Sequence, residues 1–275
     1  YNCSFCTIPL ARGKSRSSSI EEVVVMAKKI VSLGSLEIVL SGINIGDFGI
    51  DYNETLLKLL IELDQIKGFH RYRISSIEPN LLSDEIITFI ANSKKFLPHF
   101  HIPLQSGSDE ILKLMQRRYK TDLYLNRINL IKEMMPDACI GVDVIVGSPG
   151  ENKNNFQETY DFIEKLDISY LHVFSYSERA NTKAISIYPK VDSCEILERS
   201  KILHLLSDQK KDEFYFGNVG KVKNILIESY NDGFLSGFSD NYIKVKVKGD
   251  LDKINSILPV KLSYFDNSIM MGEYL

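Results

Sequence analysis

The chain has 275 residues and a mass of 31.4 kDa, more than one compact core usually holds, so we expect one large domain and a small appendage. Hydrophobic residues make up 44% and charged residues 25%, a composition that excludes disordered and fibrous proteins. No run of residues approaches the roughly 18 apolar positions of a membrane helix, so no membrane span is expected. The net charge of −3 argues against binding of nucleic acid by overall charge alone. It does not exclude a local basic patch.

The first 215 residues alternate between helical and strand-like segments. Ser19 and Glu22 form a capping box that begins a helix ending near Gly34. Further helices are predicted over residues 54–66, 83–95, 108–118, 121–135, 154–166 and 193–215, and strands over residues 36–40, 71–77, 99–104, 139–146 and 170–175. Strands that alternate with helices are parallel and joined by right-handed crossovers, so we expect an α/β fold, either a doubly wound sheet or a barrel.

Polar and glycine-rich segments follow each of the five predicted strands. In α/β barrels the loops after the carboxyl ends of the strands carry the chemistry. We therefore expect these five loops to build a single site. They comprise residues 41–46, 75–79, 105–108, 147–151 and 176–179.

Beyond Gly217 the hydrophobic pattern changes to alternation, which predicts a small all-β module and a division into domains 1–216 and 217–275. Its strands are expected over residues 221–229, 233–238, 242–248 and 258–265. In the strand at 242–248 every second residue is basic, so Lys244 and Lys246 lie on one face. This is either a functional cationic face or an edge strand that lysines protect against aggregation.

The four cysteines are too few for a disulfide scaffold, which predicts a reducing compartment and a cytoplasmic protein. We expect the isolated Cys139 and Cys194 to be small buried hydrophobic residues. Cys3 and Cys6 form a C-x-x-C pair, which also occurs in zinc sites and redox pairs. A zinc site would need a second pair of ligands, and a redox pair would lie between a strand and a helix of a thioredoxin-like fold. The third possibility for the C-x-x-C pair is an iron–sulfur cluster held by its thiolates.

Residues 3–9, with the basic segment 12–17, resemble the radical S-adenosylmethionine (SAM) methylthiotransferases. This family has the cluster motif C-x3-C-x2-C, so Cys3 and Cys6 correspond to its second and third cysteines, and the first would precede Tyr1. The family's first barrel strand would also precede the chain. The resemblance therefore implies a partial (β/α)6 barrel of which five strands are present. The small β module resembles the family's RNA-binding TRAM domain.

Four further segments are similar to the family: residues 39–49, 73–79, 101–108 and 143–151. The first of them is nearest to the branch that adds a methylthio group to threonylcarbamoyladenosine next to the anticodon of tRNA. The branches for isopentenyladenosine in tRNA and for a ribosomal protein differ there. Two positions depart from the family, Ser18 where Arg is common and Asn181 where Gly is common. Because Asn tolerates a positive φ, we expect the turn at Asn181 to survive.

The resemblance implies two cofactors, a [4Fe–4S] cluster and SAM. Cys3 and Cys6, with the upstream cysteine, would hold the cluster and leave one iron open for the amino and carboxylate groups of SAM. The implied SAM contacts are Ser41, Gly42 and Asn44 at the methionine end, Gln105, Ser106 and Arg118 at the carboxylate or ribose, and Gly147 and Tyr176 beside the adenine. For the glycines the alternative is a role in turn geometry. No side chain is assigned a catalytic role, since the radical chemistry belongs to the cofactor.

The implied partner is tRNA, besides sulfur and electron donors that the sequence does not identify. Arg12, Lys14 and Arg16 would form a phosphate-binding rim with the basic residues of 111–120, which include Arg117, and Lys244 and Lys246 would add a second RNA contact. A solvated helix face is the alternative for the rim. His99 and His101 share one face of a predicted strand, where hydrogen bonding is favoured over a metal pair.

In this family a second [4Fe–4S] cluster, on an N-terminal domain that this chain lacks, handles the sulfur. We therefore expect that the chain by itself does not complete methylthiolation. Three other functions remain open. The same barrel could act on isopentenyladenosine tRNA or a ribosomal protein, or the chain could be a non-catalytic RNA-binding protein with incidental cysteines.

Overall fold

The computed structural model describes residues 2–266 and 269–275. Five parallel strands form its larger part: β1 (Glu37–Leu40), β2 (Arg71–Ile74), β3 (His99–His101), β4 (Cys139–Val146) and β5 (Tyr170–Ser175). β1 pairs with β2, β4 pairs with β3 and β5, and a parallel bridge between Ser76 and His101 joins the two groups. The strand order follows the chain without a reversal, which is typical of a barrel and not of a doubly wound sheet. The predicted partial barrel is confirmed.

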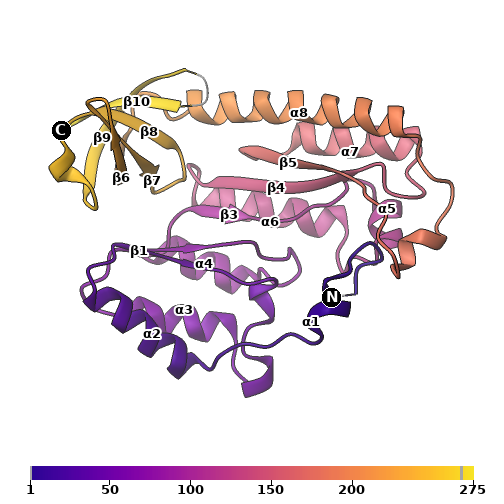
Figure 1. Cartoon of the computed structure of the whole chain (residues 1–275), viewed down its shortest axis with the longest axis horizontal. Helices are drawn as coiled ribbons and strands as arrows, with labels where there is room; N and C mark the ends of the chain where they lie inside the picture. Colours follow the sequence, from indigo (N-terminus) through magenta and orange to yellow (C-terminus); the bar gives the residue numbers. More distant parts are fainter. Residues whose placement is uncertain (1, 267–268) are drawn as a thin grey trace.

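Helices alternate with the strands along the chain, as the hydrophobic pattern predicts for every helix except the first (Figure 1). They are α1 (Ile8–Arg12), α2 (Ile20–Ser32), α3 (Leu56–Asp64), α4 (Asp84–Asn92), α5 (Asp109–Leu114), α6 (Thr121–Met134), α7 (Lys153–Lys165) and α8 (Ser193–Phe216). The capping box that begins α2 is present, because Ser19 and Glu22 each accept a hydrogen bond from the other's backbone N–H. Such a cap stabilises a helix by about 1 kcal/mol. The short α1 was not predicted. Among the residues described, none of these helices is both long and apolar enough to cross a bilayer.

The core lies between the sheet and the helices that cover its outer face. In β4 the side chains of Ile140, Val142, Val144 and Val146 are fully buried there. Each buried aliphatic side chain of this size contributes about 1.5–3 kcal/mol to folding. Because side chains of a strand alternate, Asp143 between them lies on the inner face of the sheet.

A closed five-stranded barrel forms the smaller part, with the order β10-β8-β7-β6-β9. Its strands are β6 (Val222–Asn231), β7 (Phe234–Ser239), β8 (Lys244–Lys248), β9 (Ile257–Asp266) and β10 (Ile269–Tyr274), of which β10 was not predicted. β8 pairs with β7 on one side and β10 on the other, so it is not an edge strand and the edge-protection interpretation is wrong. Lys244 is exposed and Lys246 half-buried, while the intervening Val245 packs inside the barrel.

The small barrel packs against the amino ends of the parallel strands. Arg71 and Arg73 of β2 donate hydrogen bonds to its backbone carbonyl oxygens at 3.1–3.4 Å. Both guanidinium groups also pair with Glu37 at the start of β1, at 2.7 and 3.1 Å. This contact places the small barrel at the end of the sheet opposite to the loops that follow the strands.

His99, at the start of β3, belongs to the same junction. Its ring stacks on Tyr242 of the small barrel, with centroids 4.2 Å apart. Neither ring nitrogen has a hydrogen-bond partner in the described part of the chain, so the hydrogen-bonding role predicted for His99 is wrong. Burial, with the nearby charge of Arg73, lowers the pKa of His99 to about 3 and keeps the ring neutral. His101 instead bonds to Asp143.

The two isolated cysteines differ. Cys139 is buried at the start of β4, as predicted, and burial raises the pKa of its thiol to about 12. Cys194 is exposed, so the prediction that it is buried is wrong. It is the second residue of α8, in the first turn after the Asp192 cap, where its side chain projects into solvent.

Candidate cofactor site at the carboxyl ends of the strands

The cysteine pair lies on a turn held between two other segments. The Cys6 N–H donates to the Cys3 carbonyl at 3.2 Å. Ser4 between them donates its N–H to the Met115 carbonyl at 3.0 Å, and its own carbonyl accepts the N–H of Ala184 at 2.9 Å. Both thiols are free and half-buried. The turn therefore fixes two sulfur ligands at the same end of the molecule as the strand-tip loops.

Arg117 connects this turn to the loop after β2. Its guanidinium donates to the Cys3 sulfur at 3.0 Å and to the Tyr119 hydroxyl at 3.1 Å, and it forms an ion pair with Glu78. Its side chain is only 3% exposed, so the prediction that Arg117 joins an RNA-binding rim is wrong. Burial raises the pKa of the Cys3 thiol, while Arg117 lowers it. A cation beside the sulfur favours the thiolate, which is the form that binds iron.

Buried polar atoms without partners gather on the strand-tip loops. Within the described ranges, they are Asn44 Oδ1, Ser75 Oγ, Ser148 Oγ, Glu151 Oε1 and Tyr176 Oη. An unsatisfied buried polar group costs about 1–3 kcal/mol, which a polar ligand can offset. Ser148 and Tyr176 also line a small cavity with Ser4 of the cysteine turn. The hydroxyl groups of Ser148 and Tyr176 beside the cysteine turn are of the kind that hydrogen-bond a zwitterionic nucleoside such as SAM.

The remaining sequence-predicted SAM contacts lie in different surroundings. Ser41 and Gly42 are exposed on the loop after β1. Gln105 is buried and has a φ of 68°, a left-handed conformation that is costly for its residue type. The Ser106 hydroxyl is fully buried and lies 3.1 Å from that of Thr159 in α7, so it faces the packed side of the loop.

The loop after β4 is fixed by a buried ion pair. Glu151 accepts the N–H of Gly147 at 2.5 Å and a hydrogen bond from Arg199 of α8 at 2.8 Å. The φ of Gly147 is 77°, and a Cβ there would lie 2.3 Å from Ile196. Glycine at 147 is therefore required by backbone conformation and packing, which supports the turn-geometry alternative for this residue.

The predicted RNA-contacting residues lie at two places. Arg12, Lys14 and Arg16 are exposed on α1 and the segment after it, as are Lys113, Arg118 and Lys120 around the end of α5. Lys244 and Lys246 belong to the small barrel, at the other end of the sheet. The turn at Asn181 has a φ of 64°, as predicted for Asn in place of Gly.

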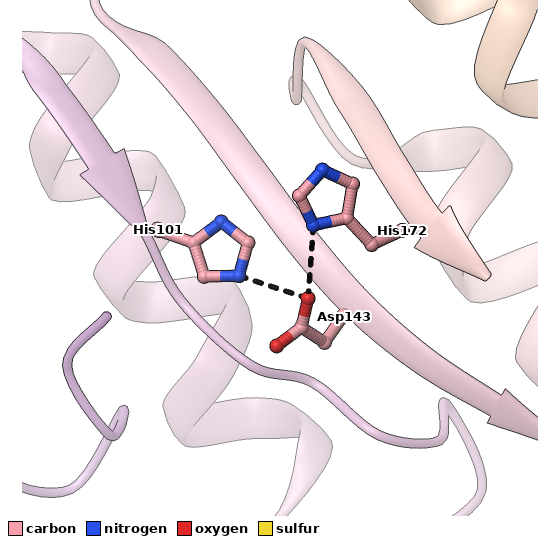
Figure 2. Close-up of side chains that lie close together, drawn as sticks. All are labelled: His101, Asp143 and His172. Carbon is pink, nitrogen blue, oxygen red and sulfur yellow. Dashed lines mark hydrogen bonds and ion pairs between the residues drawn. The ribbon is translucent and has the colours of Figure 1, made fainter. Parts of the chain in front are cut away.

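One group was not predicted. His101 of β3, Asp143 of β4 and His172 of β5 converge on the inner face of the sheet (Figure 2). The available signal was a polar residue within each of three predicted strands, but sequence alone does not show which strand residues lie opposite one another.

Comparison with known proteins decides the family. The model of the Radical SAM superfamily matches residues 1–163, which is more than half of the chain. The chain belongs to the radical SAM superfamily. It is 42% identical over 267 residues to the threonylcarbamoyladenosine tRNA methylthiotransferase MtaB of Bacillus subtilis, covering 94% of this chain and 59% of that protein. It is 33% identical over 278 residues to the tRNA-2-methylthio-N(6)-dimethylallyladenosine synthase of Lachnoclostridium phytofermentans, covering 99% and 61%.

The chain thus spans about three fifths of the length of these relatives, and its resemblance to methylthiotransferases is confirmed, with higher identity to MtaB than to the synthase. Among solved structures it is similar to the radical SAM methyltransferase TsrM from Kitasatospora setae. The TM-score is 0.54 at 17% identity, and the match covers 64% of this chain and 34% of that one. At this identity the likeness shows the fold alone.

Proposed function

We propose that this chain is the SAM-binding barrel and RNA-binding module of a radical SAM enzyme that adds a methylthio group to threonylcarbamoyladenosine next to the anticodon of tRNA. The observation that carries the proposal is the thiol pair Cys3 and Cys6 at the carboxyl-end rim of a parallel barrel whose sequence is 42% identical to MtaB. The higher identity to MtaB than to the dimethylallyladenosine synthase favours threonylcarbamoyladenosine over isopentenyladenosine as the target.

In this proposal Cys3 and Cys6 supply two of the three thiolates of a [4Fe–4S] cluster, and the third comes from upstream. When bound, the cluster and SAM supply a radical able to remove hydrogen from an unreactive carbon. Arg117 holds Cys3 in place and favours its thiolate. Asn44, Ser148 and Tyr176 orient SAM through polar atoms that lack hydrogen-bond partners among the residues described.

We further propose that residues 1–216 and 217–275 are separate domains, because each part has its own hydrophobic cluster. Arg12, Lys14 and Arg16 would contact tRNA phosphates near the cofactor site, and Lys244 and Lys246 would contact a more distant part of the same RNA. We place the enzyme in the cytoplasm, where tRNA is found. Because such a cluster needs three thiolates and Cys3 and Cys6 supply two, we propose that residues 1–275 alone do not complete methylthiolation.

The test is nucleoside analysis by mass spectrometry of tRNA from a deletion strain. We expect loss of the methylthio group from threonylcarbamoyladenosine and its return with the full-length gene but not with a Cys3→Ser copy. Loss from dimethylallyladenosine instead, or unchanged tRNA with an unmodified ribosomal protein, would assign the enzyme to a sister function. Iron and sulfide content of the purified full-length protein separates all three from a non-catalytic RNA-binding protein.

A further inference from the structure

A histidine–aspartate–histidine group occupies the inner face of the sheet (Figure 2). His101 Nε2 lies 2.9 Å and His172 Nδ1 lies 3.3 Å from the same atom, Asp143 Oδ1. Asp143 and His172 are register partners on β4 and β5, and His101 ends the neighbouring β3. The same carboxylate oxygen therefore hydrogen-bonds the His101 ring and lies at ion-pair distance from the His172 ring.

Aromatic side chains line the inner face of the sheet around this group. Gly141, two residues before Asp143, has no Cβ, and the Tyr170 ring lies over it; a Cβ would come within 2.4 Å of that ring. On β5 the side chains of Tyr170, His172 and Phe174 follow one another at every second residue. Their ring centroids are separated by 5.2 Å and then 6.5 Å.

Two members of this row are unusually exposed for the inside of a barrel. The side chain of His172 is 53% exposed, and Phe174 is 51% exposed. Tyr176, the next residue in the row, lines the cavity beside the cysteine turn. At about 3.3 Å per residue, Phe174 lies about 7 Å along the strand from Tyr176. The row therefore runs from the cofactor rim down to the histidine–aspartate–histidine group.

An exposed aromatic ring next to an oriented polar group suits a nucleobase. Enzymes that act on a base take it out of the stack, place it on apolar or aromatic side chains and hydrogen-bond its edge. Because Nδ1 of His172 faces Asp143, its Nε2 points away from the carboxylate (Figure 2), and it has no hydrogen-bond partner among the residues described.

We infer that Phe174 and His172 bind the target adenosine. The base stacks on Phe174, Nε2 of His172 hydrogen-bonds the polar substituent on N6, and Asp143 is the positioning residue that holds the His172 ring. This inference rests on the proposed function, which supplies adenosine as the substrate. The alternative is a divalent metal ion, since the three ligand atoms lie within 4.8 Å of one another. A metal ion would leave the exposed Phe174 ring without a role.

The test is the affinity of the full-length protein for anticodon stem-loop RNAs that differ only in the target nucleotide, threonylcarbamoyladenosine or adenosine, measured by fluorescence anisotropy. The wild type should bind the modified RNA about 10- to 100-fold more tightly, the value of one hydrogen bond to a charged or strongly polar group. His172→Phe should abolish that preference and leave the affinity for unmodified RNA within about twofold.

Three further variants separate orientation, hydrogen bonding and stacking. His172→Gln keeps a distal hydrogen-bonding group and should retain part of the preference, while Asp143→Asn should reduce it without changing the affinity for unmodified RNA. Phe174→Ala should weaken binding of both RNAs, whereas Phe174→Tyr, which keeps the ring, should not.

Equal binding of the two RNAs by the wild type, or a preference that survives in His172→Phe, would overturn the inference. So would one equivalent of a divalent metal ion in the wild type that is lost in Asp143→Asn, because the ring nitrogens would then be metal ligands. Binding is measured without turnover. A protein that prefers the modified RNA but adds no methylthio group would contradict the proposed function and leave this inference standing.

Discussion

Arg117 donates a hydrogen bond to the Cys3 sulfur across 3.0 Å. The same guanidinium pairs with Glu78, so one buried cation links the cysteine turn to the loop after β2. Hydrogen bonds and positive charge next to a cluster sulfur make an iron–sulfur cluster easier to reduce.

Replacing Arg117 by Met should therefore shift the reduction potential of the reconstituted cluster in the negative direction. The measurement is a redox titration of the full-length protein followed by electron paramagnetic resonance. Lys113→Met, which removes an exposed cation of α5, is the control and should leave the potential unchanged. An identical potential in the wild type and Arg117→Met would show that this contact does not tune the cluster.

His99 should make the protein acid-sensitive. Its folded-state pKa is about 3 and its ordinary value is 6.5, so the unfolded state binds a proton more readily than the folded state between these pH values. The contribution of neutral His99 to the free energy of unfolding is fully present above pH 6.5 and is lost as the pH falls toward 3. Between pH 6.5 and 5 the loss is about 2 kcal/mol. Urea unfolding of the wild type and of His99→Phe at several pH values measures this loss. The free energy of unfolding of the variant should depend less on pH between 6.5 and 5. The same pH dependence in both proteins would contradict the account.

Gly147→Ala should destabilise the protein more than a glycine replacement in open space. Gly147 combines a φ of 77° with a contact of 2.3 Å between the added Cβ and Ile196. Gly34 has a φ of 84° and nothing within 4 Å, so Gly34→Ala measures the backbone cost alone. We expect Gly147→Ala to cost about 1–3 kcal/mol more in urea unfolding. Equal costs would mean that the loop after β4 moves aside freely.

The exposed cations Arg12, Lys14 and Arg16 should contribute to tRNA affinity through phosphate contacts. Replacing all three with Gln should reduce the slope of log Kd against log salt by about 0.7–0.9 for each contact that is lost. Lys29→Gln on α2, another exposed cation, is the matched control. If the triple variant keeps the wild-type salt slope, the RNA crosses a different surface.

Much of the fold could be predicted because the hydrophobic pattern of each element is local. The bounds of β4 and β5 agree with the alternation in the sequence, and the helix at α2 begins at its predicted cap. β10 was missed because its residues, 269–274, include two methionines and a glycine. It is defined by pairing with β8 and β9 when the small barrel closes.

The site could be predicted less completely. A short motif placed Cys3 and Cys6 in one turn. However, the burial of Arg117 depends on Glu78, a residue 39 positions away. The contact between Asp143 and His172 likewise depends on the register of β4 and β5, which no local pattern contains.

The central claim is that Cys3 and Cys6 hold a [4Fe–4S] cluster that binds SAM. Its most direct test is iron and sulfide analysis, with electron paramagnetic resonance, of the anaerobically reconstituted protein extended upstream of residue 1. The account predicts a reduced cluster signal that changes when SAM is added and disappears in Cys3→Ser and Cys6→Ser. Zinc at these cysteines, or a SAM-responsive cluster that survives both substitutions, would contradict it.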